Sequence, residues 1–133
     1  MYKVVIVDDE PIISEGLKKV IDWNEFNCRV VATADSARAG AETIRQEKPH
    51  ILITDIKMPG NDGLYMLAGL KSEFPDMQVT VLTGYGDFEY AQRAIRLGIC
   101  RFLLKPSKMD ELTEALREMT RWLDEIYESH RSE

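Results

Sequence analysis

The chain has 133 residues, which is close to the commonest size of one domain and long enough to bury a hydrophobic core. Hydrophobic residues make up 44% of the sequence and charged residues 30%, a balance typical of a globular protein and not of a disordered one. The formal net charge of −6 argues against general binding of nucleic acid, and no apolar run is long enough to span a membrane, so we expect a cytoplasmic protein.

The sequence alternates between two hydrophobic patterns. Short apolar runs rich in β-branched residues predict strands, and apolar residues spaced three and four apart predict helices. In chain order these are a strand over residues 3–7, a helix over 11–21, a strand over 28–34, a helix over 37–47, a strand over 51–53, a helix over 64–74, a strand over 78–82, a helix over 88–97, a strand over 100–104 and a last helix that includes Leu112.

Local signals support the first of these elements. Pro11 suits the first turn of a helix, where its missing N–H costs nothing. Trp23 and Phe26 should hold a loop over residues 22–27 against the core. The first helix should pack on the sheet through the apolar residues Ile13, Leu17, Val20 and Ile21.

Strand–helix units repeated at this length predict a parallel sheet with helices on both faces. A closed eight-stranded barrel would need about twice as many residues. We therefore expect an α/β fold with a flavodoxin-like, doubly wound sheet of five strands in the order 2-1-3-4-5.

Four of the predicted strands end in residues that can carry chemistry: Asp8 and Asp9 after the first, Asp55 after the third, Thr83 at the fourth and Lys105 after the fifth. Neighbouring strands lie about 4.8 Å apart, so the three carboxylates should converge at one edge of the sheet. Singly, these residues have structural explanations, such as a turn cap for Asp55. Together, the three carboxylates would repel one another unless cations balance their charge, and Lys105 and Mg²⁺ are the best candidates.

Such a site suits phosphoryl transfer to an oxygen nucleophile. A carboxylate can accept the group and form an acyl phosphate. The metal and Lys105 would neutralise the phosphoryl oxygens in the transition state, and the Thr83 hydroxyl would donate a hydrogen bond to one of them.

Four motifs stand at these strand ends: Val-Asp-Asp-Glu-Pro over 7–11, Asp-Ile-Lys-Met-Pro over 55–59 with Gly63, Thr-Gly at 83–84 and Lys-Pro at 105–106. Through them, the chain over about residues 2–120 resembles the response-regulator receiver domains of two-component signalling. The resemblance implies that Asp55 accepts phosphate from a sensor histidine kinase. It also implies a Mg²⁺ site formed by Asp9, Asp55 and the backbone carbonyl of Lys57, with Asp8 acting through water.

The resemblance assigns further roles. Thr83 would be the switch hydroxyl that moves to the phosphoryl group, and Lys105 would pair first with Asp55 and then with that group. The chain departs from the family at the switch aromatic, which is often Tyr and here is Phe102. Because Phe102 has no hydroxyl to hold a rotamer, the coupling of the site to the surface is less well defined than the chemistry.

The stretches Ile21-Asp22-Trp23 and 83–98 resemble receivers that precede AraC-type DNA-binding domains with two helix-turn-helix motifs. These 133 residues contain no such domain, so we expect no direct DNA binding by this chain. It is either the receiver of a longer transcriptional regulator or a stand-alone regulator that acts through protein–protein contacts. In both cases we expect a signalling switch and not an enzyme.

Families that use a strand-end aspartate or bind a nucleotide in other ways fit this sequence less well. A haloacid-dehalogenase-type phosphatase needs Asp-x-Asp after the first strand, whereas Asp8 and Asp9 are adjacent. A dinucleotide-binding domain needs a Gly-rich loop there, and three acidic residues would repel a pyrophosphate. A degenerate receiver that serves only as an interaction module would not need the full set of strand-end residues.

The C-terminal stretch carries an apolar stripe with a period close to 3.5 residues: Met109, Leu112, Leu116, Met119, Leu123 and Ile126. We expect a receiver domain over 1–120 and a helical extension over 121–133, with the last helix continuing to about Glu128. Beyond Thr120 the stripe should lie outside the receiver core and begin a signalling linker. A homodimer could form through this linker, or through the helix over 88–97, the strand over 100–104 and the last helix.

Overall fold

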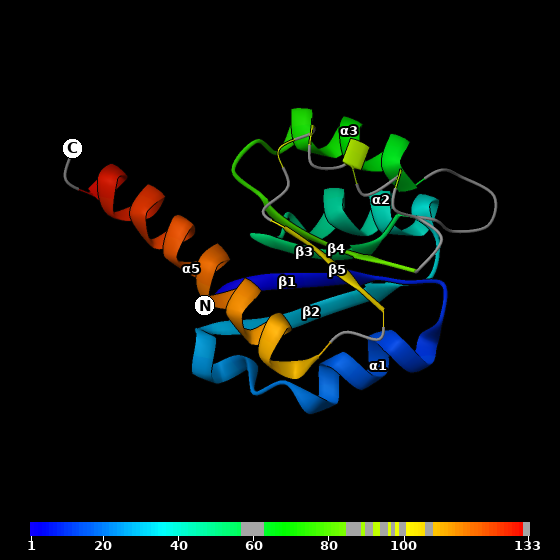
Figure 1. The fold of residues 1–133 in the computed structure, drawn as a ribbon. Helices are drawn as coiled ribbons and strands as arrows, with labels where there is room; N and C mark the ends of the chain where they lie inside the picture. Colours follow the sequence, from blue (N-terminus) through cyan, green and yellow to red (C-terminus); the bar gives the residue numbers. More distant parts are fainter. Residues whose placement is uncertain are drawn as a thin grey trace.

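The computed structural model describes residues 1–56, 63–84, 89, 92–93, 96, 98, 101–105 and 108–131. Five parallel strands form one sheet in the predicted order β2-β1-β3-β4-β5 (Figure 1). The strands are β1 (Tyr2–Val7), β2 (Cys28–Ala34), β3 (Ile51–Asp55), β4 (Gln78–Thr83) and β5 (Arg101–Leu104). The helices are α1 (Pro11–Val20), the 3₁₀ helix η1 (Trp23–Phe26), α2 (Ala37–Glu47), α3 (Gly63–Glu73) and α5 (Met109–Arg131). The helix predicted over 88–97 falls mostly outside the described residues.

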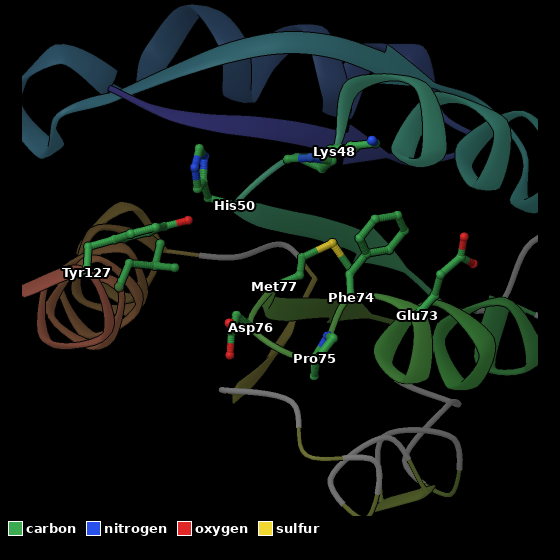
Figure 2. A pocket seen from close by; sticks show the side chains of 10 residues that line it. Lys48, His50, Glu73, Phe74, Pro75, Asp76, Met77 and Tyr127 are labelled. Carbon is green, nitrogen blue, oxygen red and sulfur yellow. The ribbon is translucent and has the colours of Figure 1, made fainter. Parts of the chain in front are cut away.

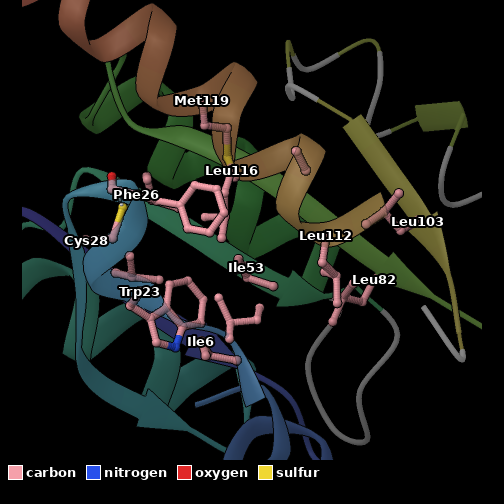
Figure 3. Close-up of a cluster of buried hydrophobic side chains, with 14 of the residues drawn as sticks. Ile6, Trp23, Phe26, Cys28, Ile53, Leu82, Leu103, Leu112, Leu116 and Met119 are labelled. Atoms are coloured by element: carbon pink, nitrogen blue, oxygen red, sulfur yellow. Dashed lines mark hydrogen bonds between the residues drawn. The ribbon is translucent and has the colours of Figure 1, made fainter. Parts of the chain in front are cut away.

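Helices cover both faces of the sheet, with α1 and α5 on one face and α2 and α3 on the other (Figure 1). Because side chains alternate along a strand, β1 serves both layers. Val4 and Ile6 join the cluster under α1 and α5, which Figure 3 shows, whereas Val5 and Val7 join the cluster under α2 and α3. The central strand β3 is buried along its whole length, as its continuous apolar run predicted.

Two details of the first helix and its loop differ from the sequence prediction. Val20 is 64% exposed, so its assignment to the buried stripe was wrong. The helix ends at Val20, and Ile21, which has an extended backbone, is buried as predicted. The loop over 22–27 contains η1, and its residues Trp23 and Phe26 are buried in the core as predicted.

Gly40 marks a close approach of α2 to the sheet that the sequence pattern missed. A Cβ atom at this position would lie 3.0 Å from both γ-carbons of Val7 and 3.4 Å from Met66 Sδ. In contrast, a Cβ atom at Gly69 of α3 would meet nothing within 4 Å. The glycine therefore allows α2 to pack closely on β1.

We expect Gly40→Ala to lower the free energy of unfolding by about 1 kcal/mol, because overpacking costs more than the better helix propensity of Ala gains. The matched change Gly69→Ala should raise it by up to about 1 kcal/mol. Urea unfolding followed by circular dichroism would measure both. Equal stabilisation by the two changes would contradict the close approach at Gly40.

Helix α5 continues without a break from Met109 to Arg131. The stripe beyond Thr120 does not stand apart from the core, because Leu123 is 1% exposed and belongs to the cluster under α1 and α5. The prediction that Leu123 lies outside the receiver core was therefore wrong, because its side chain packs within that core. Trp122 is 58% exposed on the same turn, and Tyr127 is partly exposed. Despite its length, α5 is not apolar enough to cross a membrane, and neither is any other helix in the described part of the chain.

Candidate functional site

The register of the strands brings the chemistry-bearing strand ends to one edge of the sheet. Val7 at the end of β1 pairs with Thr54 of β3, so Asp8 follows beside Asp55. On the other side of β3, Asp55 pairs with Leu82 of β4. Thr83 at the end of β4 pairs with Leu104 of β5, and Lys105 comes directly after Leu104. Parallel pairing in this order therefore gathers side chains that lie far apart in the sequence.

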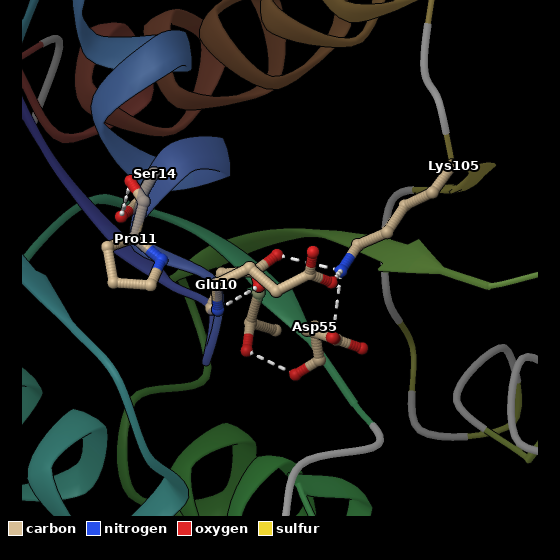
Figure 4. A network of polar contacts seen from close by, with 7 residues as sticks. Glu10, Pro11, Ser14, Asp55 and Lys105 are labelled. Atoms are coloured by element: carbon tan, nitrogen blue, oxygen red, sulfur yellow. Dashed lines mark hydrogen bonds and ion pairs between the residues drawn. The ribbon is translucent and has the colours of Figure 1, made fainter.

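Lys105 is the cation around which these acids are arranged (Figure 4). Its Nζ atom donates a hydrogen bond to Asp55 Oδ2 at 2.9 Å and lies 2.9 Å from Asp8 Oδ2. Glu10 Oε1 lies 3.6 Å from the same ammonium group. Sequence reasoning found the meeting of Asp8, Asp55 and Lys105 but missed the contact with Glu10. Glu10 stood in the acidic run, yet the pattern gave no sign of which acids would reach the lysine.

Burial makes these charges interact strongly. The exposed fractions are 1% for Asp8 and 5% for Asp55. Burial raises the pKa of Asp8 above its usual range, although the Glu10 N–H and Lys105 act in the opposite direction. Burial alone would lower the pKa of Lys105, but its contacts with Asp55 and Asp8 outweigh this effect and raise the pKa above its ordinary value. The lysine is therefore fully charged at neutral pH.

An excess of carboxylate oxygens surrounds this one ammonium group. Single carboxylate oxygens of Asp8, Asp9 and Glu10 all lie within 4.8 Å of one another. Asp8 Oδ1 accepts a hydrogen bond from the Glu10 N–H at 2.9 Å. Asp8 Oδ2 is buried and has no hydrogen-bond partner of good geometry among the described residues, so its contact with Lys105 is an ion pair only. A buried carboxylate oxygen with spare acceptor capacity fits a hard cation with oxygen ligands.

The remaining predicted site residues are described less fully. Thr83 is the last residue of β4, but the position of its hydroxyl lies outside the described atoms, as do Lys57 and Pro106. Phe102, on β5, is half-buried and packs against the cluster under α2 and α3.

The model of the response regulator receiver domain matches residues 4–117. The chain belongs to this family. Among solved structures, the receiver domain of AraT, a response regulator from Geobacillus stearothermophilus, is 39% identical with a TM-score of 0.90, and the match covers 95% of this chain and 98% of that one. A two-component transcriptional regulator AraC from Clostridium phytofermentans is 28% identical with a TM-score of 0.85, over 94% of this chain and 97% of that one.

Curated relatives of the receiver are transcriptional regulatory proteins. YesN of Bacillus subtilis, itself an uncharacterised regulator, is 38% identical over 119 residues, which are 90% of this chain and 32% of the relative. HptR of Staphylococcus aureus is 38% identical over 123 residues, 92% of this chain and 48% of the relative. The chain thus spans about a third to a half of the length of these relatives. It is the receiver domain of a two-component response regulator.

Because its pKa is raised, the Asp8 carboxylate costs folding free energy at neutral pH. An unfolded chain releases this proton at lower pH than the receiver does, so stability falls as pH rises from the ordinary Asp pKa to the raised one. We expect Asp8→Asn to raise the free energy of unfolding at neutral pH, without metal, by on the order of 1 kcal/mol. The gain should disappear below the ordinary Asp pKa of about 3.9. Urea unfolding across this pH range would measure it, and a destabilised variant at neutral pH would contradict the argument.

Proposed function

We propose that this receiver is the phosphoacceptor switch of its response regulator, with Asp55 as the residue that receives a phosphoryl group from a sensor histidine kinase. The observation that carries the proposal is the hydrogen bond of Lys105 Nζ to Asp55 Oδ2 at 2.9 Å, at the carboxyl end of the central strand. A buried carboxylate held beside a fixed cation is suited to covalent catalysis on phosphorus.

In the proposed reaction, the bond between phosphorus and the kinase's histidine nitrogen breaks as a bond to a carboxylate oxygen of Asp55 forms. The Asp55 carboxylate must approach a phosphoryl group that is itself negative, and the ammonium of Lys105 reduces this repulsion. Once the acyl phosphate has formed, Lys105 would pair with the phosphoryl oxygens. Thr83 would donate its hydroxyl to another of them, and Phe102 would respond as the switch aromatic.

A Mg²⁺ ion fits the acidic site, because carboxylate oxygens outnumber the single ammonium group and one buried oxygen of Asp8 has spare acceptor capacity. Asp9, Asp55 and the backbone carbonyl of Lys57 would hold the ion directly, and Asp8 would hold it through water. When bound, it would neutralise phosphoryl oxygens.

The output that we propose is transcriptional regulation by an AraC-type DNA-binding domain in the full-length protein. The support is that the regulators to which the chain is similar are two to three times longer than the matched segment, and that one structural neighbour is the two-component transcriptional regulator AraC of Clostridium phytofermentans. In this proposal the receiver, over residues 1–120, acts in the cytoplasm without contacting DNA or a membrane and has no enzymatic role beyond its own phosphorylation. The extension over 121–133, in which Leu123 still packs in the receiver core, leads to the output domain. A homodimer would form through the predicted helix over 88–97 with β5 and α5, or through the rest of that extension.

The proposal is tested by incubating the receiver with acetyl phosphate and Mg²⁺ and measuring its intact mass. We expect one added phosphoryl group on the wild type and on Asp76→Asn, whose carboxyl group is exposed, and none on Asp55→Asn. An adduct that persists in Asp55→Asn would place the acceptor elsewhere. A wild type that takes no phosphoryl group would instead favour a receiver that acts only through protein–protein contacts.

A further inference from the structure

Three aromatic side chains meet at the amino end of the sheet, opposite the acidic site. Tyr2 of β1 stacks on Tyr127 of α5, with ring centroids 6.1 Å apart and planes at 26°. His50, just before β3, contacts both rings edge to face, at 5.3 Å from Tyr2 and 5.8 Å from Tyr127. We call Tyr2, His50 and Tyr127 the clasp. Aromatic pairs in these geometries contribute beyond their buried area.

Polar contacts fix the clasp on both sides. The Lys3 N–H donates to His50 Nδ1 at 2.9 Å, which holds the imidazole against β1. The Tyr2 hydroxyl donates to the Asp124 carboxylate and so holds α5 one turn before Tyr127. Burial, and then Asp124, raise the pKa of Tyr2, so its hydroxyl remains a donor at neutral pH. Together with buried Leu123, these contacts attach the helix well past Thr120 to the body of the receiver.

We infer that the clasp is a pH-sensitive latch that sets the direction in which the end of α5 leaves the receiver, closed while His50 is neutral and opened by its protonation. Because Nδ1 accepts the Lys3 N–H, it carries no proton in the closed state. A proton on Nδ1 would face that N–H with a second donor, so the bond would be lost and the ring displaced from the two tyrosines. The inference does not depend on phosphorylation of Asp55.

Burial and two nearby positive charges favour the neutral form of His50 in the closed clasp. Burial, then Lys3 and the chain's amino group, lower the pKa of His50. From other elements, Lys48, Glu73 and Asp76 line the same pocket as His50 and Tyr127, and Figure 2 shows these side chains. Glu47 is occupied by an ion pair with Lys3, and Asp124 by the Tyr2 hydroxyl.

Opening exposes the imidazole and restores its ordinary pKa. A group whose pKa is lower in the closed state than in the open one binds more protons when open, so a fall in pH favours opening. The pH range over which opening increases begins near the ordinary His pKa of about 6.5 and extends down to the lowered pKa of His50 in the closed clasp. At one pH unit below the ordinary His pKa, the population of the open state should be up to about tenfold larger than at a pH above this range.

Amide hydrogen exchange tests the latch in the whole chain, after correction for the intrinsic pH dependence of exchange. We expect exchange over residues 124–131 to accelerate by up to about tenfold between pH 7.5 and pH 5.5, relative to residues 112–119. His50→Asn keeps an acceptor near the Nδ1 position but cannot titrate, so the acceleration should vanish. His130→Asn, which removes the chain's other histidine, should retain it.

A second variant separates the latch from simple loss of packing. Tyr2→Phe removes the bond to Asp124 while keeping the ring, so exchange should be faster at both pH values and still depend on pH. If the wild type shows no relative acceleration, or if His50→Asn keeps it, the latch is refuted. Loss of the acceleration in His130→Asn would also overturn the assignment to His50.

Discussion

Replacing Lys105 by Met should lower the free energy of unfolding by about 3 kcal/mol at neutral pH without metal, because it leaves buried carboxylates without their cation. Lys105 Nζ lies 2.9 Å from the buried Oδ2 atoms of Asp8 and Asp55, and Met fills a similar volume without the charge. Removing one partner of a buried ion pair costs about 3–5 kcal/mol. The low end applies here because the lysine side chain is 16% exposed.

The pH dependence of this loss follows from the two pKa shifts. The pKa of Lys105 is raised, so the stabilisation is present below the ordinary Lys pKa of about 10.4 and is lost as pH rises through the raised value. On the acid side, the attraction to Asp8 weakens as pH falls through the raised pKa of that carboxyl group. The difference between wild type and Lys105→Met should therefore be largest around neutral pH and shrink in acid.

Urea unfolding at several pH values would measure the effect of Lys105→Met. The matched control is Lys108→Met, which removes an exposed lysine close in sequence and should change stability by less than about 0.5 kcal/mol. Equal effects of the two replacements would mean that the ion pairs of Lys105 contribute little to the fold.

The sequence predicted the site because parallel strands impose a simple geometry. Once the strands and their order are known, the residues after β1, β3 and β5 must meet, and Asp8, Asp55 and Lys105 do so within hydrogen-bonding distance. Hydrophobic spacing also placed α2 at residues 37–47, where a Ser36 cap and a left-handed Lys48 give it clear ends.

The same sequence patterns could not predict contacts between elements that are far apart in the chain. The spacing that suggested a coiled coil in the last helix is equally compatible with packing against a sheet, and the structure uses it that way at Leu123. Tyr2, His50 and Tyr127 meet only because the amino ends of β1 and β3 lie beside the end of α5. No local signal in the sequence links these three residues. Gly40 is a similar case, because its role depends on Val7 in another element.

The burial of Leu123 leads to the second large effect that we expect. Leu123→Ala should lower the free energy of unfolding by about 2–4 kcal/mol, because a buried Leu→Ala change loses transfer free energy and leaves a cavity. Leu123 is 1% exposed and shares its cluster with Leu116, Met119 and Ile51. A loss of this size is a substantial fraction of the stability of a domain, about 5–15 kcal/mol.

The neighbouring Trp122 provides the control for Leu123→Ala. Trp122 is 58% exposed, so Trp122→Ala should change stability by less than about 0.5 kcal/mol although it removes a larger side chain. Urea unfolding would give both values, and sedimentation of the same variants would report any change in association. If Leu123→Ala left stability unchanged and weakened self-association instead, Leu123 would belong to a linker that pairs two subunits. Because the receiver buries Leu123 in its own core, we expect the loss to appear in the stability of the single chain.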